Sequence, residues 1–150
     1  MNSAPFGTWK SPINSDLIVK GAIGLSSPSL LQNGICWIES RPQEGGRSVL
    51  VEQDQEGNVR DITPSSFNIR TRVHDYGGGS SLIHNGVHYF SNFSDQQLYQ
   101  HNFEDSEPTQ LTDSKGLRFA DGCIDPKRNR IIYVVEDHRV SGEPENMIGA

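Results

Sequence analysis

The feature that most constrains the fold is an internal repeat of a strand, a tight turn and a second strand. Three segments align: SPSLLQNGICWIES (27–40), GSSLIHNGVHYFSN (79–92) and DGCIDPKRNRIIYVVED (121–137). The Asn-Gly dipeptides of the first two segments, Asn33-Gly34 and Asn85-Gly86, are 52 residues apart (85 − 33) and favour type I′ turns, in which both central residues take positive φ. A fixed period of this length indicates a repeat architecture with one supersecondary unit in each period.

The residues after each Asn-Gly hairpin complete the unit. The runs RSVLVEQD (47–54) and QQLYQHNF (96–103) read as third strands, and DIT (61–63) and QLT (110–112) read as short fourth strands that end in Thr. The 15 Gly and 8 Pro leave few intervals long enough for a helix. Four strands in about 50 residues are typical of a propeller blade, so we predict an all-β fold, a partial β-propeller of about two and a half four-stranded antiparallel blades.

The blade boundaries follow from the repeat. We expect an N-terminal lead-in segment (1–26), followed by an incomplete propeller (27–150) with blade one at about 27–64, blade two at about 79–113 and a partial third blade at about 117–150. A blade buries its faces only against neighbouring blades, and a ring needs typically about 4–8 of them. We therefore expect a fragment of a larger propeller, or a chain that completes itself by association.

Charge and cysteine content restrict the partners and the compartment. The net charge of −6 argues against nucleic acid and anionic membranes, which require a basic surface. We find neither a secretory signal nor a hydrophobic stretch long enough to span a membrane. Cys36 and Cys123 stand far apart, which indicates two small buried side chains in a reducing compartment rather than a disulfide. These observations favour a cytoplasmic location.

Five segments resemble a known family. They are FGTWKSPI (6–13), RPQEGGRSVLV (41–51), FNIRTRVHDYGGGS (67–80), YFSNFSDQQLY (89–99) and LRFADGCIDPKRNRIIYVVEDH (117–138). Together they resemble the N-terminal propeller of the prolyl oligopeptidase family of serine peptidases, nearest to its dipeptidyl aminopeptidase/acylaminoacyl peptidase branch. One departure is Asp75, which stands where Glu is expected and leaves the charge unchanged.

This resemblance implies a two-part enzyme. An N-terminal propeller would cover a C-terminal α/β-hydrolase domain that carries a Ser, Asp and His triad, and would limit substrates to short or unfolded peptides. This chain would then hold the first blades of the propeller, with the hydrolase domain and the peptide substrate as its partners. We expect no catalytic residue and no cofactor in the chain, and no hydrolysis by the chain alone.

The densest polar cluster lies ahead of the Gly-rich run GGG (77–79). Its substrate-facing candidates are Arg72, His74, Asp75 and Tyr76, with Arg70 beside them. A segment that leads into the first strand of a blade runs close to the propeller axis, where charged side chains can contact the ends of a peptide. The structural alternative, which the sequence favours, is a network of Arg–Asp and Tyr hydrogen bonds that joins blade one to blade two.

Two other sites of chemistry are rejected from local geometry. The nucleophile motif Gly-x-Ser-x-Gly is absent, and in GGGSSLI (77–83) Leu82 stands where the second Gly is required. His84 and His88 have the spacing of a zinc helix, but a turn at Asn85-Gly86 places them on opposite faces of a hairpin, so we expect no metal site. Two rival functions stay open: a stand-alone propeller-like scaffold that binds peptides or proteins, and a metal-dependent propeller lactonase.

Overall fold

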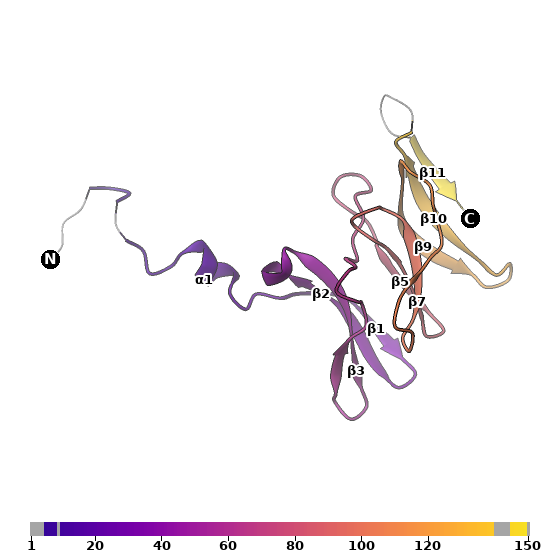
Figure 1. Cartoon of the computed structure of the whole chain (residues 1–150), viewed down its shortest axis with the longest axis horizontal. Coiled ribbons are helices and arrows are strands. Elements are labelled where there is room, and N and C mark those ends of the chain that lie inside the picture. Colours follow the sequence, from indigo (N-terminus) through magenta and orange to yellow (C-terminus); the bar gives the residue numbers. More distant parts are fainter. Residues whose placement is uncertain (1–4, 9, 140–144, 150) are drawn as a thin grey trace.

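The computed structural model describes residues 5–8, 10–139 and 145–149. Within them the chain forms three antiparallel sheets that lie side by side (Figure 1). The first sheet contains β1 (Gly24–Leu31), β2 (Gly34–Arg41), β3 (Arg47–Asp54) and β4 (Val59–Asp61). The second contains β5 (Ser81–His84), β6 (Val87–Ser91), β7 (Leu98–Asn102) and β8 (Thr109–Gln110). The third contains β9 (Leu117–Asp125), β10 (Arg130–Asp137) and β11 (Glu145–Gly149).

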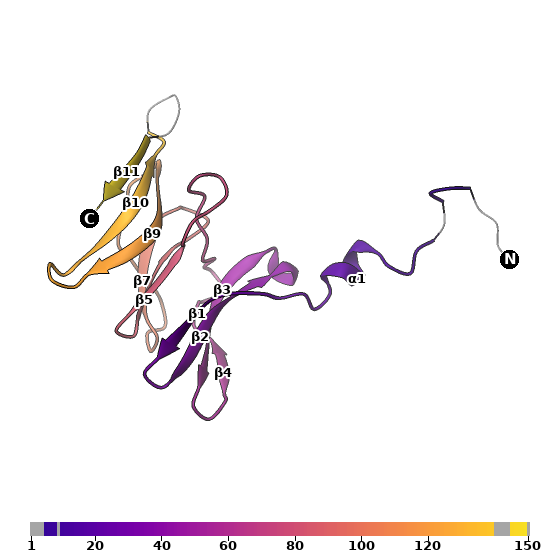
Figure 2. The same ribbon diagram turned by 180° about the vertical axis from the view of Figure 1, so that it is seen from behind.

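The strands of each sheet follow one another in chain order, so every connection within a sheet joins neighbours. This meander is the arrangement of a propeller blade, and the expected all-β fold with about two and a half blades is confirmed. We call the three sheets blade one, blade two and blade three. Seen from behind, β4 forms an edge of blade one (Figure 2).

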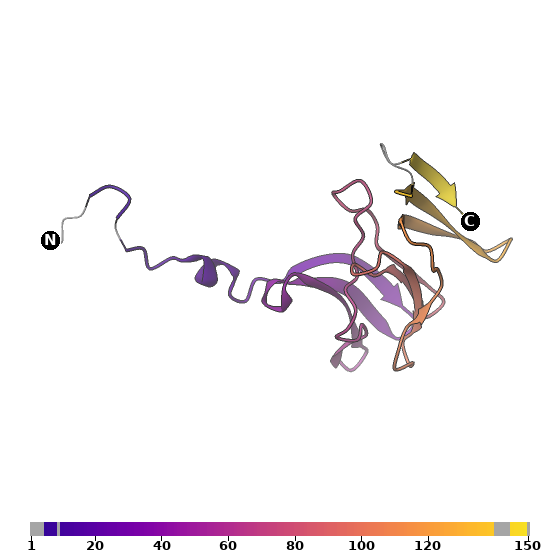
Figure 3. The same cartoon turned by 45° about the horizontal axis from the view of Figure 1, so that its top comes forward.

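In the part of the chain that the structure describes, helical structure is confined to two short segments. The helix α1 (Ser15–Val19) begins at Asn14, whose side-chain oxygen accepts a 2.8 Å hydrogen bond from the Leu17 amide. It lies within residues 10–23, which extend away from the three blades in both views (Figures 1 and 3). The 3-10 turn η1 (Pro42–Glu44) connects β2 to β3.

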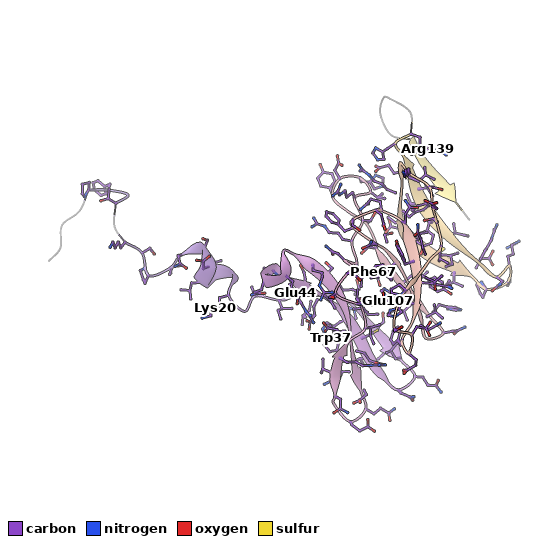
Figure 4. All side chains as sticks on the ribbon, viewed as in Figure 1. Lys20, Trp37, Glu44, Phe67, Glu107 and Arg139 are labelled. Atoms are coloured by element: carbon purple, nitrogen blue, oxygen red, sulfur yellow. The ribbon has the colours of Figure 1, made fainter. Side chains whose placement is uncertain are left out.

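The core lies between the blades rather than within one of them. One apolar cluster fills the space between blades one and two, where the Phe67 ring packs edge-to-face against Phe90 and Tyr99. Figure 4 labels Phe67 between these two blades. A second cluster, which includes Leu98 and Tyr133, lies between blades two and three. Because faces alternate along a strand, the neighbours Leu98 and Tyr99 on β7 serve the two different clusters.

The Thr that ends each repeat has a structural reason. The Thr63 hydroxyl accepts a 3.0 Å hydrogen bond from the Leu50 amide in blade one. The Thr112 hydroxyl accepts the equivalent 2.9 Å bond from the Leu98 amide in blade two. In both blades a side chain therefore replaces the backbone partner that a longer fourth strand would supply to the third strand.

The two Asn-Gly dipeptides differ in their turns. Asn85 and Gly86 have φ of 51° and 76°, as expected for type I′. The first hairpin turns at residues 32–33 instead, Asn33 does not have positive φ, and Gly34 opens β2, so a type I′ turn at Asn33-Gly34 is wrong. Gly34 has a different role, because a Cβ there would overlap the Gln53 carbonyl oxygen on β3.

The cysteines are both free, but they differ in exposure. Cys36 is fully buried in the cluster between blades one and two, as expected. Cys123 on β9 is exposed, so the expectation that it is buried is wrong. Its strand belongs to the outer blade of the described chain, where no further sheet among the described residues covers the opposite face.

Candidate functional site

The candidate residues lie on the segment that runs from β4 to β5. Its backbone is fixed against blade two: the Arg70 amide donates to the Ser91 carbonyl at 3.1 Å, and the Arg72 amide donates to the Gln96 side chain at 2.8 Å. Further along, the Gly79 amide donates to Asp121 of β9 at 2.7 Å, and the Asp121 amide donates back to the Gly79 carbonyl at 2.8 Å. The Ile69 amide also donates to the Ser48 carbonyl of β3 at 3.0 Å, so the segment contacts all three blades before it enters the first strand of blade two.

A sharp turn projects from this segment. His74 and Asp75 have φ of 56° and 58°, and Gly77 has φ of 82°. Two consecutive non-glycine residues in the left-handed region cost about 1–2 kcal/mol each. The turn is held by bonds from the Asp75 amide to the Arg72 carbonyl and from the Gly77 amide to the Val73 carbonyl. Such strain persists only where the surroundings fix it, and it presents the Tyr76 ring, 98% exposed, to solvent.

The buried carboxylate of Glu136 on β10 fixes the turn. It accepts hydrogen bonds from the His74 amide at 3.1 Å, from His138 Nε2 at 2.6 Å and from Arg118 at 3.3 Å. Burial raises the pKa of Glu136, but the hydrogen bonds from His138 and the His74 amide outweigh it, so its pKa lies below the ordinary value. The charged carboxylate is therefore the form that the fold stabilises.

Arg118 links the turn to the same carboxylate. Its guanidinium donates to the Arg72 carbonyl at 3.0 Å and lies 3.6 Å from the exposed carboxylate of Asp75. The polar network around the candidate residues therefore joins the segment to blade three, whereas the sequence favoured a network between blades one and two. Glu136 and Arg118 were missed because nothing in VVEDH or GLRFAD marks a side chain that reaches a loop more than 40 residues away.

The two arginines of the segment share one aromatic ring. The guanidinium carbons of Arg70 and Arg72 lie 4.9 Å and 4.4 Å from the centroid of the Phe93 ring. Phe93 lies in the connection between β6 and β7, and its amide donates to the Asn68 carbonyl at 2.9 Å. Alternation along an extended segment explains why residues two positions apart meet the same ring.

A groove of about 380 Å³ adjoins Arg70. Its lining is mostly hydroxyl groups and glycine backbone, with an apolar contribution from Ile38 and Ile69. Of the substrate-facing candidates only Tyr76 lines it, and Arg70 does so as well, while Arg72, His74 and Asp75 lie outside its lining. The structure thus divides the sequence-predicted cluster into a part at the groove and a part bound to blade three.

The histidine hairpin follows the expected register. His84 pairs with Val87 and Ile83 pairs with His88, which places the two imidazoles on opposite faces of the sheet. Within residues 5–8, 10–139 and 145–149, no group of three or more His, Cys, Asp or Glu side chains is placed to hold a metal ion. Over the same residues, no helix is long and apolar enough to cross a membrane.

The fold and the site define the class of protein as a partial β-propeller with a strained, polar inter-blade segment beside a groove. Three solved structures are similar to this chain in fold. A Mycobacterium tuberculosis puromycin-hydrolyzing peptidase is 31% identical over 90% of this chain, with a TM-score of 0.72. A puromycin hydrolase mutant complexed with PGG is 26% identical over 97% of the chain, with a TM-score of 0.79, and a puromycin hydrolase is 25% identical over 99%, with a TM-score of 0.75.

These neighbours bear on the family resemblance seen in the sequence. The resemblance to the propeller of prolyl oligopeptidase-family peptidases is confirmed in structure over nearly the whole chain. The chain spans only 22–24% of the length of these peptidases. No protein-family profile and no curated protein matches the chain.

Proposed function

We propose that the chain forms the first blades of a propeller that covers a C-terminal α/β-hydrolase domain and controls which peptides reach its Ser, Asp and His triad. The observation that carries this proposal is the structural match, at TM-scores of 0.72–0.79, to peptidases about four times as long as this chain. The reaction we propose for the whole enzyme is hydrolysis of short aminoacyl, dipeptidyl or acylaminoacyl substrates in the cytoplasm.

The chain supplies no nucleophile of its own in this proposal. The sequence contains no Gly-x-Ser-x-Gly, the motif that places a serine on a strained turn between a strand and a helix. Ser80 and Ser81, the nearest imitation, lead into the strand β5 rather than into a helix. The contribution of the blades is therefore steric and electrostatic: they restrict the path to the site and present polar groups along it.

The outer face of blade one supports closure by a further blade. Side chains alternate between the two faces of a sheet, so Ile35 lies on the face opposite the buried Cys36. Leu25 and Leu30 of β1 lie on the same outer face as Ile35. Their side chains are 42%, 70% and 88% exposed. An apolar sheet face of this kind is stable when another sheet packs on it, as in a closed propeller.

The same face favours one alternative function, a peptide-binding scaffold that closes its ring from several copies of this chain. Light scattering of the purified chain separates the two. A discrete oligomer of two or three chains would support the scaffold, and a monomer would support the peptidase propeller.

A chimaera tests the proposed function directly. The segment of a puromycin hydrolase that matches this chain is replaced by this chain, and a deletion of the same segment is the control. We expect the chimaera to hydrolyse a short aminoacyl substrate and to leave a folded protein intact, while the deletion variant loses that discrimination. The chain alone should hydrolyse neither. Cleavage of the folded protein by the chimaera, or turnover by the chain alone, would contradict the proposal.

A further inference from the structure

Two arginines differ from all the others in the chain. Seven of the nine arginines have a carboxylate oxygen within 4.0 Å: Arg41, Arg47, Arg60, Arg118, Arg128, Arg130 and Arg139. In the described part of the chain, Arg70 and Arg72 have none. The chain has more carboxylates than basic side chains and a net charge of −6. The lack of a carboxylate partner at these two neighbouring arginines is therefore a specific feature of this surface.

The structure holds these two guanidinium groups in place. Their backbone amides are bound to the Ser91 carbonyl and the Gln96 side chain, and both guanidinium groups lie over the Phe93 ring. Both side chains are exposed, and a guanidinium group carries five N–H donors. The pair is thus positioned and exposed, with donors available for an anion.

The groove beside Arg70 bears on what kind of anion fits; Arg72 and Phe93 lie outside its lining. It is lined by Arg70, by the exposed ring of Tyr76 and by the backbone of residues 77–79, and Ile38 and Ile69 give it an apolar part. Its volume of about 380 Å³ falls in the range of about 300–1,000 Å³ that holds small ligands. An anion with an attached apolar group fits such a site better than a bare inorganic ion.

We propose that Arg70 and Arg72 bind the carboxylate of a short peptide whose neighbouring apolar side chain enters this groove. Planar guanidinium groups match carboxylates through paired, charge-assisted hydrogen bonds. The choice of a peptide as the source of the carboxylate rests on the proposed function, whereas the carboxylate site itself rests on the geometry. The role of Phe93 is to hold both guanidinium groups, as a positioning residue.

Binding of three peptides to the 150-residue chain, measured by calorimetry, tests the proposal. The probes are Ala-Ala-Phe with a free carboxylate, its C-terminal amide, and an amidated, acetylated peptide that carries one Asp. We expect binding of the first peptide and at least about tenfold weaker binding of the amide, the loss of about 1.4 kcal/mol or more of charge-assisted hydrogen bonding. Equal binding of the free carboxylate and the Asp peptide would identify any peptide carboxylate as the ligand; preference for the first would identify the C-terminus.

Two variants of equal charge separate this site from general electrostatics. The double variant Arg70→Ala/Arg72→Ala should weaken binding of the free-carboxylate peptide at least about tenfold. The control Lys127→Ala/Arg128→Ala removes two positive charges from the exposed turn between β9 and β10, at the opposite end of the blades, and should leave binding unchanged. Arg70→Lys keeps the charge and loses the planar fork, so we expect an intermediate effect.

Three results would overturn the inference: no binding of the free-carboxylate peptide, equal binding of its amide, or equal losses in the two double variants. Circular dichroism of each variant shows that its fold is retained. Because calorimetry on this chain requires no hydrolase domain, failure here leaves the result of the chimaera experiment standing. Failure of the chimaera likewise leaves a measured carboxylate site in place.

Discussion

The fully buried imidazole of His88 predicts that the two-blade core loses stability in mild acid. His88 lies on β6 with 0% exposure, stacks on Phe90 at 4.8 Å and has its Nε2 2.9 Å from the Ser81 hydroxyl. It pairs across the strands with His101, whose Nε2 lies 3.0 Å from the Asp105 carbonyl, and the Nδ1 atoms of both rings are buried without a hydrogen-bond partner. Burial, with a smaller contribution from His101, lowers the pKa of His88 from 6.5 to about 3.

The sign and the size of the effect follow from this difference. The unfolded chain binds a proton at His88 below about pH 6.5, and the folded chain does not until about pH 3. The stabilisation is complete above the unfolded pKa and is lost as the pH falls. Between about pH 7.5 and about pH 5 the free energy of unfolding should decrease by about 2 kcal/mol from this residue alone. Carboxylates add little there, because their ordinary pKa values lie near 4.

Urea unfolding followed by circular dichroism at the two pH values measures the decrease. His88→Gln keeps a polar partner for Ser81 but does not titrate, so its free energy of unfolding should change by about 2 kcal/mol less over this interval than that of the wild type. His84→Gln, at the end of β5, is the matched control and should keep the wild-type dependence. If the wild type and His88→Gln lose equal stability, the buried imidazole is not the cause.

Three further predictions concern packing and access. Phe90→Ala should cost about 3–5 kcal/mol of unfolding free energy in urea titrations, because the ring is 1% exposed between blades one and two; a loss below about 1 kcal/mol would contradict this packing. Gly79→Ala should lower the melting temperature measured by calorimetry, since its Cβ would lie 2.8 Å from Asp121 Oδ1, and an unchanged value would contradict that contact. A thiol reagent should label exposed Cys123 at once and Cys36 only after unfolding, because burial, together with Glu52, raises the pKa of Cys36 to about 11; equal labelling rates would refute the difference.

The sequence predicted the parts of the fold that depend on local pattern. β3 begins and ends at the residues expected from RSVLVEQD, and the register of the β5–β6 hairpin follows from Asn85-Gly86. Gly34 was assigned to a turn because an Asn-Gly dipeptide indicates only that the backbone can adopt positive φ. It does not report how closely β3 approaches, and that approach is what requires glycine here.

The candidate site was predictable in its location but not in its contacts. Consecutive polar residues before three glycines indicate a loop that leads into a strand, and the structure has that loop. Which side chains of the loop are bound depends on Glu136, 62 residues beyond His74. A contact of that separation depends on the packing of blade three, and no local pattern in the sequence encodes it.

The hydroxyl groups of Thr63 and Thr112 also limit what the outer edges of the blades can recruit. Since each hydroxyl takes over a bond at the third strand, β4 needs only three residues and β8 only two. A long, flat edge strand exposes a row of unpaired amides and carbonyls with which a strand of another chain can pair. Very short edge strands expose few such groups. The repeat therefore carries protection against fibril-like stacking at the rim of blades one and two.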